Sequence, residues 1–401
     1  MRGKKRKQEK KEGRIIPGYI LPALAVFLLA GASVLTYLLG FSGKSTKISP
    51  LYEEFYSAST ELRDRIRKID KGIYEALYRS EIPERDVFFL EVQPRHQNGY
   101  LWEVTKLLVR CPDYSSKSDL LKRIKAAMIM LNPQPTLRVQ KDGEDKLICQ
   151  IIMNMFLTHK IVLDSASDRA IPKRVRPLVA IIVDDLGYDA RVDCSFMESG
   201  LPLTFSVLPS APFTDLVVRE ANKERLELMA HLPMEPKNYP EIKPGPGALL
   251  LYMGEKDTLR ALGKALDQIP GARGANNHMG SSFTENRDHM MVVLNGLKEK
   301  GLFFVDSRTS ENTVGMHLAS ALGLPAVARD VFLDNDLNHR SIEMQLERFL
   351  NLARHSGNAV GIVHPHAETL QVLNKYVPRI KDEFEAVPVS RLVSRQPVGV
   401  Q

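Results

Sequence analysis

The chain has 401 residues, which is more than a single hydrophobic core ordinarily holds and enough for two domains. It is 44% hydrophobic and 26% charged, a composition that excludes an intrinsically disordered protein, a collagen-like protein and a multi-span transporter. The formal net charge is +7, but the segment 1–14 alone holds eight Lys or Arg and two Glu. Because the rest of the chain is close to neutral, we expect no nucleic-acid partner.

The basic segment 1–14 precedes an uncharged run, residues 15–41. As a helix, about 20 residues of this run would be about 30 Å long, which matches a bilayer core. Lys and Arg on one side predict a single-pass anchor in the cell membrane. The N-terminus would lie in the cytoplasm beside anionic headgroups, and everything after Gly43 in the periplasm or outside the cell. Ala30-Gly31-Ala32 resembles a signal-peptide cleavage site, but the run exceeds the roughly 7–15 apolar residues of a signal peptide, which favours an uncleaved anchor.

Residues 51–165 are predicted to form a small α+β domain. Its apolar residues change from helical spacing to strand-like runs separated by turn residues. We find no catalytic constellation in it, so we expect it to bind or assemble, with an envelope protein as its partner. Cys111 and Cys149 both lie near predicted strand ends, where an extracytoplasmic location would permit a disulfide. The expected elements are helices over 51–77 and 118–131 and strands at 87–92, at 101–109 and on either side of Asp142-Gly143.

A second domain is predicted over residues 177–392, behind a basic, proline-bracketed linker at 171–177. Apolar strand-like runs alternate with helical stretches throughout it. This alternation predicts an α/β fold with a parallel sheet, either closed as a (β/α) barrel or open and doubly wound. The strand-like runs are 178–183, 203–208, 226–230, 302–305, 326–328 and 359–363, and the helical stretches are 256–269, 287–300, 312–322 and 340–354.

Polar residues stand where these apolar runs stop. In parallel α/β folds the carboxyl ends of the strands meet at one edge of the sheet, where the active site gathers. Carboxylate and imidazole together are the ligands that a divalent metal such as zinc takes, with an open position left for water. We therefore expect a metal site at this edge. The polar stops are Asp184-Asp185, His231, Asn276-Asn277-His278, Asp306 and His364-Pro365-His366.

Six motifs follow one another in order through this domain: IVDDLG at 182–187, LTFSVLP at 203–209, HLPMEP at 231–236, NNHMGS at 276–281, DSRT at 306–309 and VHPH at 363–366. On these motifs the chain from Pro177 to Val389 resembles the divergent polysaccharide deacetylases, part of the superfamily of metal-dependent polysaccharide deacetylases and carbohydrate esterases. The resemblance implies a distorted (β/α) barrel of about seven strands. It also implies descent from a metal-dependent hydrolase.

The resemblance places the general base at Asp184 and a metal ligand at Asp185. Gly187 permits a tight turn after the pair, so both carboxylates can border one pocket. The superfamily's next motif has two histidines four residues apart, and here the second position is Glu235. We expect His278 on the next strand to supply that imidazole, so the predicted ligands are Asp185, His231 and His278. Glu235 is the alternative ligand, or else a loop residue paired nearby.

For the last motif, the resemblance places a catalytic histidine at His364, which we interpret as the general acid. We leave His366 to orientation or helix capping, because Pro365 makes a regular strand through it unfavourable. Asp306 is expected to orient a histidine, and Arg308 to bind an anionic group of the substrate. The segment containing Asn277 replaces the superfamily's substrate-side arginine motif.

Together these residues predict a membrane-anchored, extracytoplasmic, metal-dependent hydrolase that acts on carbon–nitrogen bonds. The substrate would be an N-acetylated envelope or extracellular glycan, and the metal would be zinc. The alternative is a catalytically silent envelope scaffold that keeps the barrel to bind a glycan or a protein. The departures at Glu235 and Asn277 favour the scaffold. The retained pair Asp184-Asp185 favours the enzyme, because a scaffold does not need ionisable groups gathered in one cleft.

The predicted anchor can be tested by cell fractionation and protease accessibility. We expect the intact chain in the membrane fraction, with residues after Gly43 cleaved by protease added from the extracytoplasmic side. A mature soluble form that begins near Ser33 would show instead that the segment is a cleaved signal peptide.

Overall fold

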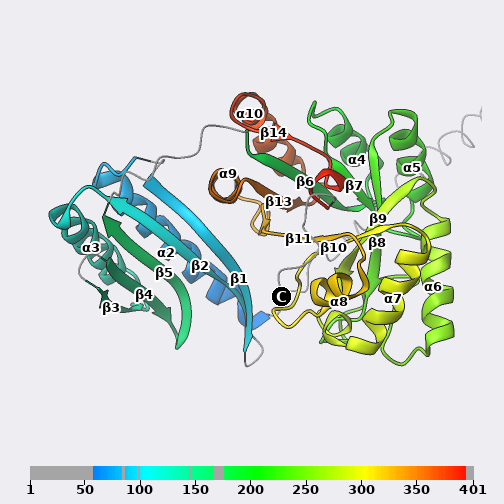
Figure 1. Cartoon of the computed structure of the whole chain (residues 1–401), viewed down its shortest axis with the longest axis horizontal. Helices are drawn as coiled ribbons and strands as arrows, with labels where there is room; N and C mark the ends of the chain where they lie inside the picture. Colours follow the sequence, from blue (N-terminus) through cyan, green and yellow to red (C-terminus); the bar gives the residue numbers. More distant parts are fainter. Residues whose placement is uncertain (1–56, 84–85, 98–99, 144–145, 166–175, 394–401) are drawn as a thin grey trace, which may run out of the picture. The chain divides into compact units, whose positions relative to one another are not determined.

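The structure is a computed structural model, and it describes residues 57–83, 86–97, 100–143, 146–165 and 176–393. All of these belong to one compact unit, Leu51–Gln401. The unit contains two separate sheets (Figure 1).

The first sheet is mixed, and its five strands lie in the order β1-β2-β5-β4-β3. Burial alternates along β4 from Leu147 to Met153, as expected for a strand with one face covered. On α2 the buried residues Leu62, Ile69 and Ile73 recur at helical spacing. The predicted helices and strands are present, and one further strand, β5, pairs in parallel with β2. The elements are α2 (Ser57–Arg79), β1 (Val87–Gln97), β2 (Tyr100–Cys111), α3 (Tyr114–Ile129), β3 (Thr136–Asp142), β4 (Lys146–Met153) and β5 (Phe156–Ser165).

The second sheet is parallel and has nine strands. Eight of them follow the order β11-β10-β9-β8-β7-β6-β13-β12, and β14 pairs with β6. Every residue of β6 is buried, which is typical of a central strand covered on both faces. The strands are β6 (Leu178–Leu186), β7 (Thr204–Val207), β8 (Glu227–Met234), β9 (Ala272–Met279), β10 (Phe303–Asp306), β11 (Ala326–Ala328), β12 (Val331–Phe332), β13 (Asn358–Val363) and β14 (Glu385–Ala386).

Helices connect most of these parallel strands, and Figure 1 shows them along the outside of the curled sheet. The predicted parallel α/β fold is therefore confirmed. Between the described strands no pairing joins β11 to β12, so the sheet is an open, partial barrel. The expected count of about seven strands is too low, because β12 and β14 have only two residues each. The helices are α4 (Ala190–Met197), α5 (Thr214–Lys223), α6 (Glu255–Asp267), α7 (Arg287–Glu299), α8 (Gly315–Leu322), α9 (His339–Ser356), α10 (Ala367–Glu383) and α11 (Ser390–Val393).

Two arginines from the part of the chain that forms the second sheet, Arg329 and Arg348, contact Glu103 on β2 of the first sheet. Glu103 pairs with Arg329 at 3.4 Å and with Arg348 at 3.6 Å. Arg348 also donates to the Thr105 hydroxyl at 2.7 Å. Both arginines are buried, and a buried guanidinium is tolerated only where such partners replace water. These contacts therefore tie β2 to α9 and to the segment that follows β11.

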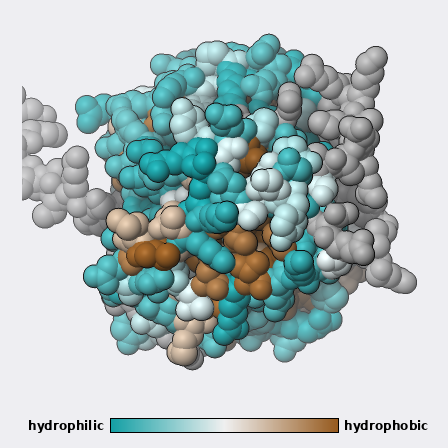
Figure 2. Space-filling view, turned by 90° about the vertical axis from the view of Figure 1, so that its left-hand side faces the viewer, coloured by the Kyte–Doolittle hydropathy of each residue, from teal (hydrophilic) through white to brown (hydrophobic). Residues whose placement is uncertain are grey.

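Across the described ranges, no helix is both long enough and apolar enough to cross a membrane. The predicted anchor at 15–41 lies outside those ranges and stays a prediction. Figure 2 shows one face of the molecule, which is mostly hydrophilic with a small apolar patch.

Cys111 and Cys149 are buried free thiols, and burial raises the pKa of Cys111 to about 11 and that of Cys149 to about 12.

The packing between β9 and β10 can be tested at Gly274. A Cβ atom at this position would lie 2.3 Å from the Phe303 ring, so Gly274→Ala should destabilise the fold by about 1–3 kcal/mol through overpacking. Urea denaturation measures the change. Gly263→Ala on α6 is the matched control, because nothing lies within 4 Å of its Cβ, and it should be neutral or stabilising. Equal stability of the two variants would contradict this packing.

Candidate metal centre

The backbone at the end of β6 turns both adjacent carboxylates toward one site. Asp185 has a φ of +59°, in the left-handed region that a buried non-glycine residue rarely adopts. The β6–β7 register shifts between Val183 and Leu186, which marks a bulge. Gly187 follows with a φ of +119°, so the expected turn begins at Asp185 itself. Strain of this kind costs about 1–3 kcal/mol and is typical of functional sites.

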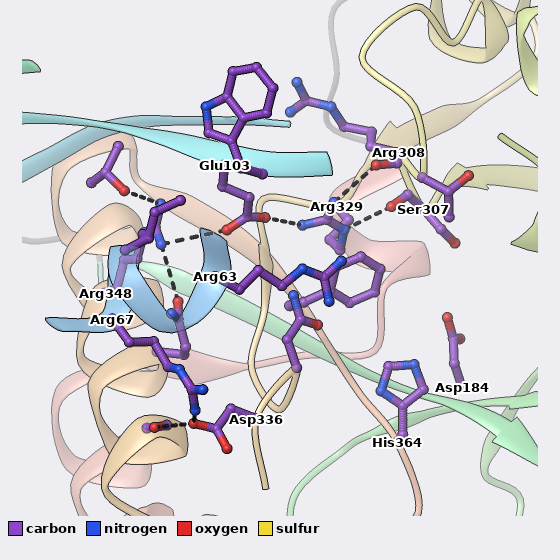
Figure 3. Close-up of a pocket in the computed structure, with 18 of the residues that line it drawn as sticks. Arg63, Arg67, Glu103, Asp184, Ser307, Arg308, Arg329, Asp336, Arg348 and His364 are labelled. Carbon is purple, nitrogen blue, oxygen red and sulfur yellow. Dashed lines mark hydrogen bonds and ion pairs between the residues drawn. The ribbon is translucent and has the colours of Figure 1, made fainter. Parts of the chain in front are cut away.

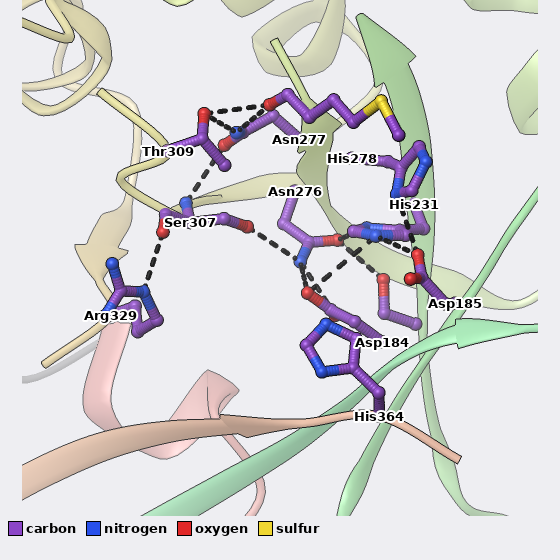
Figure 4. Close-up of polar contacts among 12 residues, drawn as sticks. Asp184, Asp185, His231, Asn276, Asn277, His278, Ser307, Thr309, Arg329 and His364 are labelled. Carbon is purple, nitrogen blue, oxygen red and sulfur yellow. Dashed lines mark hydrogen bonds and ion pairs between the residues drawn. The ribbon is translucent and has the colours of Figure 1, made fainter. Parts of the chain in front are cut away.

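Asp185, His231 and His278 converge on one point, as the sequence predicted (Figure 4). Asp185 Oδ1 lies 2.8 Å from His231 Nε2 and 2.8 Å from His278 Nδ1. One ligand atom from each residue lies within 4.8 Å of the others. All three residues are at most 5% exposed. They come from the parallel strands β6, β8 and β9, of which β8 and β9 are adjacent and β7 separates β6 from β8.

The donor set fits a divalent metal. Both Asp185 oxygens are buried, and neither has a partner with hydrogen-bond geometry, although the two imidazole nitrogens are only 2.8 Å away. Short contacts without hydrogen-bond alignment are what converging ligands make around a shared centre. One carboxylate and two imidazoles match a catalytic zinc site with three protein ligands. Burial by itself raises the pKa of Asp185, but His278 and His231 lower it far below its ordinary value.

Asn276 fixes the orientation of His231. The amide oxygen of Asn276 lies 2.9 Å from His231 Nδ1 and also accepts from the Ser206 hydroxyl at 2.6 Å. Because an amide oxygen can only accept, His231 Nδ1 must carry the proton. His231 Nε2 is then left with its lone pair facing Asp185. A metal-binding histidine is ordinarily held this way by a partner on its other nitrogen.

Asn276 also holds Asp184. Its amide nitrogen donates to both Asp184 oxygens, at 2.9 and 3.0 Å. This is the segment where the resemblance leads us to expect an arginine, and the substitute carries no charge. Burial raises the pKa of Asp184, and the nearby His231 and His364 oppose that rise only in part. Asp184 is therefore a buried carboxylate with a raised proton affinity, as a general base requires.

His364 lies beside Asp184 and is held by a carboxylate that the sequence analysis missed (Figure 4). Its Nδ1 is 2.9 Å from Asp334 Oδ1, and its backbone N–H donates to Asp334 Oδ2 at 2.7 Å. Thr369 donates to the same Asp334 oxygen. Asp334 therefore accepts a hydrogen bond from His364 Nδ1–H and fixes the orientation of the imidazole. The only sequence signal was an Asp just after the two-residue strand β12.

Two predicted residues have other partners. Asp306 accepts from the Arg308 backbone N–H at 2.9 Å and from the Thr313 hydroxyl at 2.8 Å, so it braces a loop. The expectation that Asp306 orients a histidine is wrong, because Asp334 has that role. Glu235 lies outside the ligand group and accepts from the Leu251 backbone N–H at 2.8 Å, which is the loop role considered as the alternative.

The remaining predicted residues surround the centre. Asn277 accepts from the Ser307 backbone N–H at 2.9 Å and donates to the Met279 carbonyl, so it positions the loop after β10. Arg308 lines the same pocket as Asp184, His231 and His278. His366 is the N-cap residue of α10 but makes no capping hydrogen bond with its side chain. Burial lowers its pKa.

An open parallel barrel with a buried Asp-His-His cluster at its strand ends, together with the family match, indicates a deacetylase-like protein. The chain belongs to the divergent polysaccharide deacetylase family, whose model matches residues 181–393.

Proteins from three bacteria are similar to this region. The uncharacterised protein YibQ of Escherichia coli (strain K12) is 32% identical over 220 residues, which cover 55% of this chain and 68% of that protein. An uncharacterised protein of Haemophilus influenzae is 29% identical over 214 residues, which cover 53% of this chain and 76% of that protein. The crystal structure of an uncharacterised protein of Agrobacterium tumefaciens C58 superposes with a TM-score of 0.53 at 25% identity, and covers 56% of this chain and 92% of that one.

The ligand set can be tested by metal analysis of purified variants. His231→Ala and His278→Ala should each lose most of a bound divalent metal, because two protein ligands remain. Glu235→Ala should keep it, because its carboxylate is engaged with Leu251. If His278→Ala retained the metal and Glu235→Ala lost it, the ligand would be the residue four positions after His231.

Proposed function

We propose that this protein is a membrane-anchored, extracytoplasmic hydrolase that removes N-acetyl groups from a glycan with the help of a divalent metal, zinc. The observation that supports this most directly is one pocket that is lined by two of the three ligand residues, by the carboxylate proposed as the base and by a carboxylate-held histidine. Asp184, His231, His278 and His364 all line that pocket. A general base and a general acid flanking a metal site are the groups that acyl transfer to water requires.

A divalent metal bound by Asp185, His231 and His278 would lower the pKa of a water molecule and polarise the acetyl carbonyl. The chain's own residues supply the proton transfers. Asp184 accepts a proton from the attacking water as the oxygen–carbon bond forms. His364 Nε2 donates a proton to the amide nitrogen as the carbon–nitrogen bond breaks. Acetate and a free amino sugar result, and Asp334 stabilises the charged form of His364 through its Nδ1–H.

The location and the partner follow from the sequence. Residues 15–41 would hold the protein in the cell membrane, with the catalytic region in the periplasm or outside the cell. An N-acetylated envelope or extracellular glycan is the substrate within reach there. The region 51–165 would contact an envelope protein, and Ile129 and Met130 at the end of α3 are exposed apolar side chains available for such a contact.

The second candidate is a silent scaffold that binds a glycan without cleaving it. The neutral pair Asn276-Asn277, in the segment that replaces the superfamily's substrate-side arginine motif, favours this reading. The Asp334–His364 pair favours the enzyme, because binding alone does not require a histidine with a fixed proton.

The role of Asp184 can be tested with Asp184→Asn. The amide keeps the shape and can still accept from Asn276, but it cannot take a proton. Fold and metal content should therefore survive while release of acetate from an N-acetylated sugar oligomer falls by roughly 10²- to 10⁴-fold. Asp185→Asn should lose metal as well as turnover. A wild-type, metal-loaded protein that binds a glycan tightly yet releases no acetate from a broad panel would support the scaffold instead.

A further inference from the structure

The pocket in front of the metal centre is built from both sheets of the compact unit. Its volume is about 230 Å³, somewhat below the roughly 300–1,000 Å³ of pockets for drug-sized ligands, which suits one sugar ring. The catalytic side is lined by Asp184 and His364. The opposite wall comes from α2 and β2 and includes Arg63 and Trp102 (Figure 3).

Two aromatic side chains give this pocket rigid apolar walls. Trp102 is 6% exposed; its indole N–H donates to the Leu157 carbonyl at 2.8 Å and its ring packs on Phe156. Phe332 packs against the guanidinium of Arg329, 3.6 Å from its ring centre, and against the ring of His364. Apolar and aromatic side chains of this kind line most small-molecule pockets.

One arginine of the pocket, Arg308, has no paired carboxylate among the described residues. Five carboxylates and five arginines line the pocket, and most pair with one another or with other residues. No described residue forms an ion pair or a hydrogen bond with the Arg308 guanidinium, although its charge opposes the raised pKa of the buried Asp306 and Asp330. The ion pairs of the lining residues include Arg67 with Asp64 and Asp336, Glu103 with Arg329 and Arg348, Asp70 with His159, and Asp184 with His231.

The backbone of Arg308 is held by hydrogen bonds on both sides, which fixes the position of this residue in the pocket wall. The residue has a φ of +51°. Its N–H donates to Asp306 Oδ1 at 2.9 Å, and its carbonyl accepts from Arg329 Nη2 at 3.1 Å. A guanidinium can make a bidentate contact with a carboxylate. Figure 3 shows Arg63, on α2, crossing the same pocket toward the side of Asp184 and His364.

We infer that this pocket is a substrate subsite, completed by α2 and β2, which takes a carboxylate-bearing sugar next to the N-acetyl group that is removed. The inference rests on the proposed function for the identity of the reacting N-acetyl group. The binding of the carboxylate-bearing sugar does not depend on that function. Arg308 binds the carboxylate, Arg63 adds a second positive charge, and Trp102 and Phe332 contact the ring. The region 51–165 is then part of the substrate site as well as a partner-binding region.

The experiment measures binding by calorimetry to the full chain carrying Asp184→Asn, so that no turnover occurs. Three oligosaccharides serve as probes: a neutral N-acetylglucosamine oligomer, an oligomer with lactyl-ether carboxylates as in N-acetylmuramic acid, and an N-acetylated oligomer with uronic acids. At least one carboxylate-bearing oligomer should bind at least tenfold more tightly than the neutral one. Comparison of the two carboxylate-bearing oligomers shows whether the carboxylate is that of a lactyl ether or of a uronic acid.

Arg308→Gln should abolish this preference and leave metal content unchanged. Arg63→Gln, on a different element, should reduce it at least threefold, and it tests the subsite if the first variant does not fold. Arg260→Gln on α6 is the matched control, because its exposed side chain pairs only with Asp257 in the described structure. Equal binding of all three oligomers, or a preference that survives both variants, would overturn the subsite. Absence of acetate release by the wild-type chain would count against the hydrolase only.

Discussion

Two adjacent carboxylates, Asp184 and Asp185, are buried at the end of one strand, and the arrangement around them compensates for their negative charge. An ionised carboxylate out of water is costly unless hydrogen bonds, cations or a metal replace the solvent. The cost of burial is offset differently for each of the two carboxylates. Both oxygens of Asp184 accept from the amide nitrogen of Asn276, whereas Asp185 faces two imidazoles that are not aligned to hydrogen bond with it. The two carboxylates therefore lie in different environments, which supports the proposed division into a base and a metal ligand.

The hydrogen bonds of Asn276 give Asp184 and His231 different environments. Asn276 offers its nitrogen to Asp184 and its oxygen to His231, so one side chain sets the state of both groups. A positive side chain in this place would lower the proton affinity of Asp184 through its charge, and an amide does not. The loss of an arginine is therefore compatible with base catalysis, and it makes burial the main influence on the pKa of Asp184.

Sequence reasoning predicted the features that depend on pattern. The parallel sheet followed from alternating apolar runs. Asp185 and His231 were found because each follows an apolar run, and His278 because the resemblance left one imidazole to be supplied. It missed Asp334 because β12 has only two residues and no periodicity to mark it. It assigned a histidine partner to Asp306 because a strand-end carboxylate does not reveal which side chain it will meet. The left-handed backbone of Asp185 lies at a bulge, which only the pairing of β6 with β7 in the structure reveals.

The contact between Glu103 and Arg329 joins residues that are 226 positions apart in the sequence. Arg329 also donates to the Ser307 carbonyl, and the Ser307 hydroxyl accepts from Asn276, so the chain of contacts reaches the amide that holds Asp184. The barrel expressed alone, cut in the linker, would keep its catalytic residues. It would also leave Arg329 and Arg348 without their shared counter-ion. Such a fragment would expose two guanidiniums that the whole protein buries, and it would be a poor substitute for the whole protein in crystallisation or screening.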